Sequence, residues 1–173
     1  KSKVDIDRLK AQLSQEFEIK DLGEARKILG MEINRDRVKI TIHLTLKQYL
    51  ERVLQRFNMN TKMKPVITPM APYFKLNALQ SPKSDEERDY VKNVPYASVV
   101  GSLMYAMVCS RPDLSYAMSL VSRYMANPGK EHWKVVQWIF RYLRGTSKAC
   151  LKFGKTGEGL TGNVDSDFAA DLD

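Results

Sequence analysis

The first apolar residues of the chain repeat at the spacing of a helix. Four of them fall on one face of residues 3–18, opposite a charged face: Ile6, Leu9, Leu13 and Phe17. This one-sided pattern predicts an amphipathic helix that has an apolar face to bury.

Two apolar runs separated by a polar stretch predict a β-hairpin over residues 28–44. The first run contains Ile28, Leu29, Met31 and Ile33. The second run alternates with polar residues, the period of a half-buried strand, at Val38, Ile40, Ile42 and Leu44. The polar residues 34–37 predict the turn between the two strands.

Residues 45–57 carry the most regular helical pattern of the chain. Six apolar residues recur at i, i+3, i+4, i+7, i+8 and i+11, namely Leu46, Tyr49, Leu50, Val53, Leu54 and Phe57. Thr45 and Gln48 have the spacing of a capping box, which predicts the start of this helix. Helical periodicity is then lost over residues 58–93, which predict a long irregular connection with one short helix over 84–91, capped by Ser84.

Helix start and stop signals divide residues 95–146 into three predicted helices of nearly equal length. Pro95 suits a first turn, Ser110 precedes a new start, and Pro128 marks the third start. Gly145 predicts the C-cap of the last helix. Residues 148–153 and 160–167 predict a C-terminal β-hairpin, so the whole chain is expected to have an α+β fold.

Basic residues gather in two segments. The 173-residue chain has a net charge of +8, and its 43% hydrophobic content is enough for a core. Residues 35–64 hold eight basic and two acidic side chains and residues 123–152 hold seven and one, a balance of +6 in each. This distribution favours a polyanionic partner. Cys109 and Cys150 have no metal-binding spacing, and no apolar run approaches the roughly 18 residues of a membrane span.

Five short motifs follow one another in residues 95–146. They are Pro95-Tyr96, Gly101-Ser102-Leu103-Met104-Tyr105, Arg111-Pro112-Asp113, His132-Trp133 and Arg141-Tyr142-Leu143-Arg144-Gly145-Thr146. Their order and spacing resemble the reverse transcriptase of copia-type LTR retrotransposons. The segment KDLGEARKILGMEI, which starts at Lys20, resembles the family's sequence just after its catalytic aspartate pair.

The resemblance implies a division of the chain into three parts. Residues 1–44 would be the remainder of a palm with its primer-grip hairpin, 45–146 a mainly helical thumb, and 147–173 the incomplete start of an RNase H domain. The catalytic aspartate pair of the palm would precede Lys1. The resemblance therefore implies part of an RNA-directed DNA polymerase that grips the primer-template duplex and is not catalytic alone.

The resemblance and the basic segments together select candidate nucleic-acid contacts. Gly30 and Met31 fall in the primer-grip hairpin, whose backbone holds the 3′ end of the growing strand; a bulge in an ordinary strand is the alternative for Gly30. The candidates for phosphate contacts are Lys47, Arg52, Arg56, Lys62, Lys64, Lys130, Lys134, Arg141 and Arg144. A solvated surface position is the alternative for each of these cations. His132 is expected to be a structural or surface histidine rather than a catalytic base. Trp133 and Trp138 are expected to pack in the core rather than stack on bases.

Two further residues resemble catalytic positions of the family. Lys20 follows the palm helix, where a lysine can protonate the leaving pyrophosphate; a solvated lysine at a helix end is the alternative. Asp165 matches the first metal-binding carboxylate of RNase H, a reaction that uses two divalent ions. Mg²⁺ is expected for the intact parent enzyme, and no cofactor for this chain, in which Asp165 would be vestigial.

The sequence leaves three functional interpretations open: part of a retrotransposon reverse transcriptase, a non-catalytic nucleic-acid-binding module, and a degenerate transposon remnant. The expected partners are an RNA/DNA or DNA duplex, bound through its phosphates, and the palm, fingers and RNase H segments of the parent polyprotein, with no membrane. The expected location is intracellular, in cytoplasmic virus-like particles for the parent element.

Overall fold

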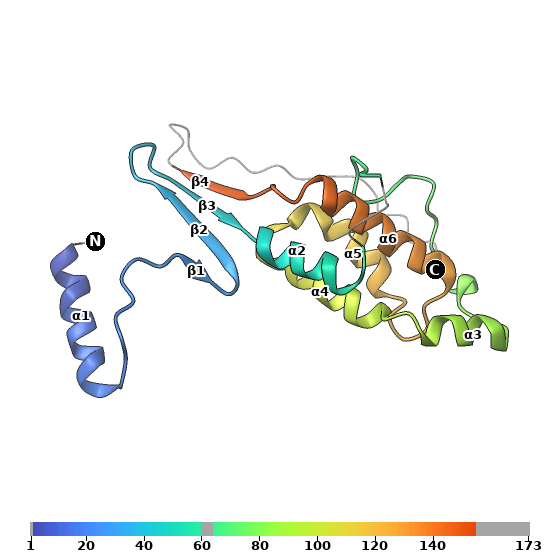
Figure 1. Ribbon diagram of the computed structural model, residues 1–173, viewed down its shortest axis with the longest axis horizontal. Helices are drawn as coiled ribbons and strands as arrows, with labels where there is room; N and C mark the ends of the chain where they lie inside the picture. The colour runs from blue at the N-terminus through green and yellow to red at the C-terminus, as the bar shows by residue number, and fades with distance from the viewer. Residues whose placement is uncertain (1, 60–63, 155–173) are drawn as a thin grey trace.

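The computed structural model describes residues 2–59 and 64–154, which form a four-stranded sheet beside a bundle of helices (Figure 1). One helix and three strands come before the bundle's first helix: α1 (Lys3–Glu16), β1 (Lys27–Ile28), β2 (Met31–Asp36) and β3 (Thr41–Thr45). The helices that follow are α2 (Lys47–Arg56), α3 (Asp85–Lys92), α4 (Tyr96–Ser110), α5 (Ser115–Ser122) and α6 (Lys130–Gly145). Short 3-10 turns occur at Ala78–Gln80 and Pro112–Leu114, and β4 (Leu151–Gly154) ends the described chain. The α+β class predicted from the sequence is therefore confirmed.

The hairpin turn lies later in the chain than the sequence pattern predicts. In β2 and β3, Asp36 pairs with Thr41, which leaves residues 37–40 rather than 34–37 as the turn. The Asp36 carboxylate accepts hydrogen bonds from the backbone N–H groups of Val38 and Lys39, both at 3.0 Å, and so fixes the turn. Val38 is consequently 93% exposed, although it continues the apolar alternation of the strand.

The sheet has the order β1-β2-β3-β4, and all neighbouring strands are antiparallel. Its last strand is contributed by the far end of the chain, because Leu44 of β3 pairs with Leu151 of β4. The predicted strand over 148–153 is thus present as the shorter strand β4, which extends the sheet formed by β1, β2 and β3. Its predicted hairpin partner, residues 160–167, lies outside the described residues.

α2 joins the sheet to the helical bundle. Leu46, Leu50 and Leu54 are buried in the main core, as the apolar period predicts. The predicted capping box is not formed, because the Gln48 side chain accepts a hydrogen bond from Lys27 at 3.3 Å and the N-cap position is Leu46.

The bundle core consists of α2, α4, α5 and α6. Its fully buried side chains include Val99, Val100, Leu103, Leu114, Val136, Ile139 and Leu143. Three helices occupy residues 95–146 as predicted, but α5 has only eight residues, because Pro112 begins a 3-10 turn before it. Gly145 lies in the last turn of α6 and Thr146 is the C-cap, so the predicted C-cap position is wrong by one residue.

The short helix predicted near Ser84 is confirmed as α3. The Ser84 hydroxyl accepts a hydrogen bond from the Glu87 N–H at 3.2 Å, and the Glu87 carboxylate accepts one from the Ser84 N–H at 3.5 Å. This reciprocal capping box explains why a helix forms within an otherwise irregular connection.

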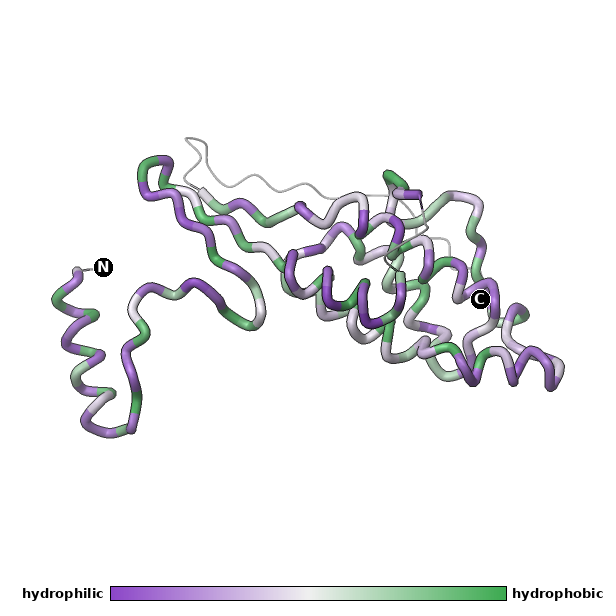
Figure 2. Tube along the Cα trace, viewed as in Figure 1, coloured by the Kyte–Doolittle hydropathy of each residue, from purple (hydrophilic) through white to green (hydrophobic). Residues whose placement is uncertain are grey.

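α1 forms over the predicted residues, but its apolar face is exposed. None of its residues is buried, and Leu9 and Leu13 are 56% and 40% exposed. Figure 2 shows hydrophilic and hydrophobic residues alternating along this helix, which stands apart from the bundle. The helix therefore has an amphipathic sequence whose apolar face is not buried by the described residues.

Candidate nucleic-acid interface

The turn between β1 and β2 is held in an unusual backbone conformation. Leu29 and Gly30 have φ values of +48° and +74°, the left-handed pair required by a tight two-residue hairpin turn. Gly30 thus lies in a turn, and the alternative of a strand bulge does not apply. Leu29 accepts positive φ at a cost that glycine avoids, so this turn needs support from its surroundings.

That support comes from α4. The Tyr105 hydroxyl donates a hydrogen bond to the Leu29 carbonyl, and Tyr105 packs against Tyr49 with ring centroids 5.1 Å apart. The Tyr49 hydroxyl in turn donates to the Ser102 carbonyl at 3.1 Å, and burial raises the pKa of Tyr49. These contacts tie the hairpin tip, α2 and α4 together, and sequence reasoning missed Tyr105 because its partner lies 76 residues away.

Met31 and Lys20 have different environments. The Met31 side chain is buried in the main core, so a contact with nucleic acid at this position would come from its backbone. Lys20 is exposed in the segment between α1 and β1.

The three α2 candidates project from the exposed side of the helix. Lys47 lies 3.8 Å from the Glu51 carboxylate, Arg52 donates to the Gln48 carbonyl at 3.3 Å, and the Arg56 guanidinium lies 5.3 Å from the centre of the Phe57 ring. All three residues are exposed. The contacts orient the cations without burying them, so their charges remain accessible to phosphates.

The α6 candidates divide between the two ends of the helix. Arg141 donates from Nε to the Lys64 carbonyl at 2.8 Å, which places Lys64 beside the C-terminal half of α6, where Arg144 also lies. Lys130 is at the other end, about 20 Å from Arg144 at 1.5 Å per residue, with its ammonium 5.2 Å from the centre of the Tyr90 ring. Lys134 forms an ion pair with Glu131. The structure therefore brings Lys64, Arg141 and Arg144 together and separates them from Lys130.

A further basic surface lies on the sheet. A cavity of about 480 Å³ is lined by Arg35, Lys47 and Lys148 together with the acidic residues Glu32 and Asp36. Sequence reasoning omitted Arg35 and Lys148, although both lie in the two segments with a charge balance of +6. The pairing of β4 with β3 brings the two segments together at this cavity.

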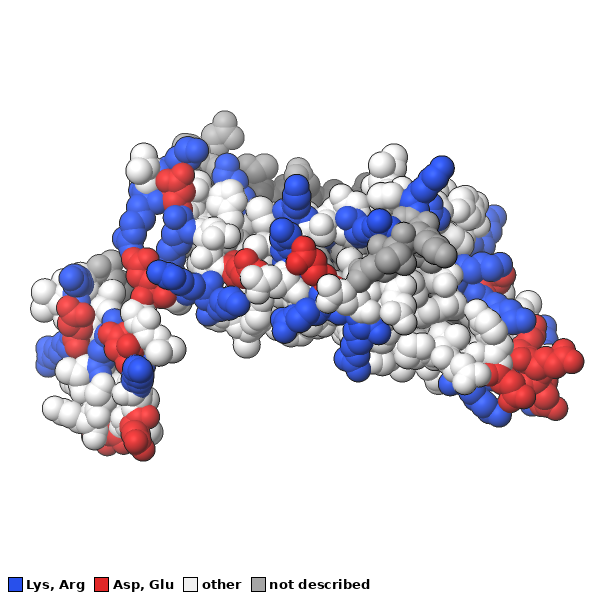
Figure 3. Space-filling model, in the orientation of Figure 1, with Lys and Arg blue, Asp and Glu red and all other residues white. Residues whose placement is uncertain are grey.

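Acidic side chains are most concentrated at one end of the molecule. Figure 3 shows Lys and Arg side chains distributed over the sheet and the adjoining helices, with some acidic side chains among them and on α1, and a dense acidic group at the α3 end. The acidic group consists of Asp85, Glu86, Glu87 and Asp89. A polyanion would therefore be attracted to the sheet and α2 and repelled from α3.

Several polar residues are structural. Arg111 is 1% exposed and bonds to Asp113 and Thr146, so this cation is closed to nucleic acid. His132 is fully buried, accepts a hydrogen bond from the Gly129 N–H at 2.8 Å and stacks on Tyr124, which confirms its structural role. Trp133 is 8% exposed and belongs to the core, as predicted, whereas Trp138 is only partly buried.

Two candidates lie outside the described residues: Lys62 and Asp165. Within residues 2–59 and 64–154, no group of three or more His, Cys, Asp or Glu side chains is arranged to hold a metal ion. Over the same residues, no helix has the length and apolar character needed to cross a membrane.

Strands β1 to β3, α2 and the α2 cations fall in the part of the chain that matches a known family. Residues 1–72 match the family described as "Reverse transcriptase (RNA-dependent DNA polymerase)". Together with the relatives below, this match supports a fragment of a copia-type retrotransposon Pol reverse transcriptase.

Three curated relatives are similar to the chain over most or all of its length. The chain is 51% identical, over all 173 residues, to the retrovirus-related Pol polyprotein from transposon TNT 1-94 of Nicotiana tabacum, of which it spans 13%. It is 39% and 37% identical, over 93% of its length, to the Pol polyproteins from transposons RE1 and RE2 of Arabidopsis thaliana, and spans 10% of each. No solved structure matches the chain.

Proposed function

We propose that the chain is the duplex-gripping part of a retrotransposon reverse transcriptase and that it is not catalytic alone. The observation that carries the proposal is the joining of a fixed hairpin turn to a basic helix within the region of family similarity. Gly30 lies in that turn, and Lys47, Arg52 and Arg56 project from α2. A hairpin tip that approaches a strand end and cations that contact phosphates are the two elements such a grip needs.

The accessible charges suit recognition of a backbone rather than of bases. A primer-template duplex is recognised through phosphates and sugar hydroxyls, which requires exposed cations and no base-specific side chains. The α2 cations are exposed, and their intramolecular contacts are weak surface contacts that a phosphate can replace. The acidic α3 end would direct the duplex toward α2 and the sheet.

The exposed face of α1 supports action within a larger polyprotein. Ile6, Leu9 and Phe17 are 44%, 56% and 62% exposed on one side of a helix that buries none of its residues. Exposed apolar patches of this kind commonly mark protein contacts. The remaining palm is the segment that would cover this face, and the Mg²⁺ of the intact enzyme would be held there and in RNase H, where Asp165 would supply one carboxylate.

Binding of an RNA/DNA hybrid tests the proposal. Fluorescence anisotropy would compare the wild-type chain with the triple variant Lys47→Ala/Arg52→Ala/Arg56→Ala, which we expect to bind about tenfold more weakly or worse. The matched control removes the same charge from the α3 region, in Lys83→Ala/Arg88→Ala/Lys92→Ala, and should change affinity by less than about twofold. Equal weakening by both variants would contradict a specific role of α2.

A further inference from the structure

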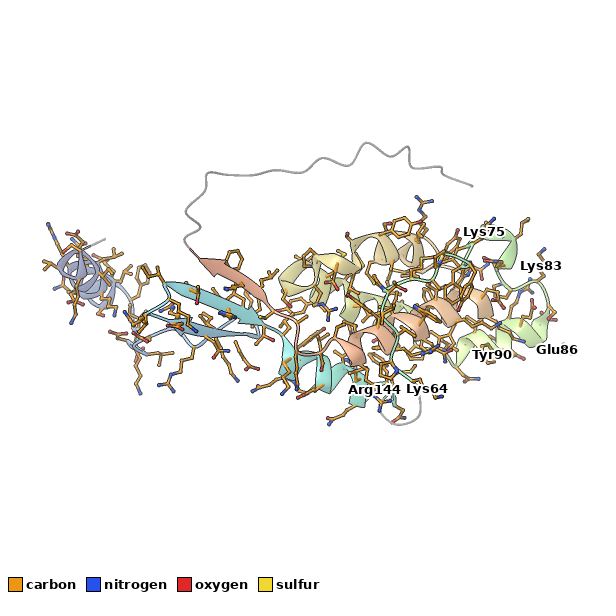
Figure 4. The ribbon with its side chains drawn as sticks, turned by 90° about the horizontal axis from the view of Figure 1, so that it is seen from above. Lys64, Lys75, Lys83, Glu86, Tyr90 and Arg144 are labelled. Atoms are coloured by element: carbon orange, nitrogen blue, oxygen red, sulfur yellow. The ribbon has the colours of Figure 1, made fainter. Side chains whose placement is uncertain are left out.

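A second concave site lies on the other side of the molecule, between the irregular connection and α6. Its volume is about 520 Å³, which is in the range of pockets that hold a small ligand. The walls come from residues 73–76 and from the outer face of α6, including Trp138 and Arg141. In Figure 4, Lys75 lies apart from Lys64 and Arg144. No α2 residue lines this aromatic pocket, which is therefore distinct from the α2 surface.

The aromatic side chains of the pocket wall hold one another in place through a hydrogen bond and ring contacts. The Trp138 indole N–H donates to the Thr68 carbonyl at 3.0 Å, and its ring meets Tyr73 and Phe74 edge-on, with centroids 5.8 and 5.6 Å away. Tyr73 also packs on Phe74 at 4.7 Å, yet remains 68% exposed. An exposed aromatic ring held by two other rings offers a preformed surface for stacking.

A planar cation lies beside this wall. The Arg141 guanidinium lies 4.7 Å from the centre of the Trp138 ring, and its Nε donates to the Lys64 carbonyl at 2.8 Å. Guanidinium planes can stack on bases and can donate hydrogen bonds to phosphates. Arg141 is thus fixed in a position where both kinds of contact are possible at once.

The pocket also has an excess of positive charge. Three basic residues line it, Lys75, Lys134 and Arg141, against the single acidic residue Glu131, which is paired with Lys134. Lys75 forms no ion pair within the described part of the chain. A ligand for this site would therefore combine a flat ring with negative charge.

We propose that the aromatic pocket binds one unpaired nucleotide of a nucleic-acid strand. A nucleotide supplies a ring for Tyr73 and a phosphate for Lys75 and Arg141. A base pair inside a duplex cannot use the pocket, because both of its faces are covered by neighbouring pairs. The inference rests on the proposed function in one respect: the unpaired nucleotide would belong to a strand whose duplex part lies on the α2 surface.

Three nucleic acids test the inference. They are a blunt RNA/DNA hybrid, the same hybrid with a single-stranded overhang that carries 2-aminopurine, and the single strand alone. We expect the wild-type chain to bind the overhang hybrid at least about fivefold more tightly than the blunt one, and to quench 2-aminopurine fluorescence by stacking. Tyr73→Ala should abolish the advantage and the quenching without changing affinity for the blunt hybrid.

The control variant is Tyr116→Ala on α5, because Tyr116 is 69% exposed and lies outside the pocket lining. It should behave as the wild-type chain, and urea melts should show that both variants are folded. Equal binding of the overhang hybrid by the wild-type chain and Tyr73→Ala would overturn the inference. If the blunt hybrid does not bind, the proposed function fails, and the single strand alone then tests the pocket. Single-strand binding that is weakened by Tyr73→Ala supports the pocket. Single-strand binding that Tyr73→Ala leaves unchanged, or no single-strand binding, refutes the pocket.

Discussion

Replacing Arg111 with alanine removes the most buried cation of the described chain. Its guanidinium donates to Asp113 at 3.0 Å from Nε and 2.7 Å from Nη2, and to the Thr146 hydroxyl at 2.7 Å. It also lies 5.2 Å from the centre of the Tyr142 ring, whose hydroxyl donates to the same carboxylate at 2.7 Å. One side chain therefore joins the end of α4, the turn before α5 and the end of α6.

The expected loss follows from the exposure of the two partners. Removing one member of a buried ion pair costs about 3–5 kcal/mol, because the other charge is left without compensation. The Asp113 side chain is 38% exposed and keeps the Tyr142 hydrogen bond, so water can replace part of what it loses. We therefore expect Arg111→Ala to lower the free energy of unfolding by about 3 kcal/mol, the lower end of that range.

Urea unfolding followed by circular dichroism measures this loss. Arg111→Lys keeps the charge but not the forked geometry, and should lose most of the same stability. The control is Arg88→Ala, whose ion pair with Asp85 spans 3.0 Å but whose side chain is 58% exposed, so that it should cost less than about 1 kcal/mol. A loss below about 1 kcal/mol for Arg111→Ala would refute the reasoning, because the pair would then behave as an exposed one.

Three further outcomes test the fold. Burial by itself raises the pKa of Asp113, but hydrogen bonds from Arg111 and Tyr142 outweigh this effect and hold the pKa below its usual value. The stability that this carboxylate contributes should therefore be lost as the pH falls below about 4. In urea melts measured over a pH series, Asp113→Asn should make the stability less dependent on pH in that range. Gly129→Ala should destabilise by about 1–3 kcal/mol or more, since an added Cβ would lie 1.8 Å from the Gln80 carbonyl oxygen, whereas Gly101→Ala meets nothing within 4 Å and should be neutral or stabilising in thermal melts. Leu103→Ala should cost about 2–5 kcal/mol in urea melts, because Leu103 is fully buried, and a cost below about 0.5 kcal/mol would contradict the described core.

Local patterns predicted the helices well. The apolar period of residues 45–57 corresponds to α2 because the residues on that face, Leu46 to Leu54, are buried in one core. Ser84 and Glu87 predicted α3 because a capping box needs only neighbouring residues. The hairpin turn was misplaced because Val38 and Ile40 continue the alternation, while the Asp36 side chain determines where the strand ends.

The contacts that build the sites are long-range, and no local pattern encodes them. An arginine such as Arg111 is expected at the surface from its residue type. Its burial becomes visible only in the structure, where it contacts Thr146, 35 residues away. Trp138 was expected in the core because its neighbours on α6 are apolar, but the irregular connection meets it through Thr68 and leaves a pocket beside it. The candidate cations on α2 could be selected from charge alone, whereas the hydrogen bond from Tyr105 to the Leu29 carbonyl, which supports the turn that contains Gly30, could not.

The salt dependence of hybrid binding tests the central claim most directly. The association constant of the wild-type chain for an RNA/DNA hybrid would be measured between about 50 and about 200 mM salt, beside the variant Lys47→Ala/Arg52→Ala/Arg56→Ala. The account predicts a steep fall for the wild-type chain and a log–log slope that is shallower by about 2 to 3 in the variant, one unit for each phosphate contact removed. A wild-type affinity that does not fall with salt, or an identical slope in the variant, would contradict the claim that this surface grips the duplex backbone.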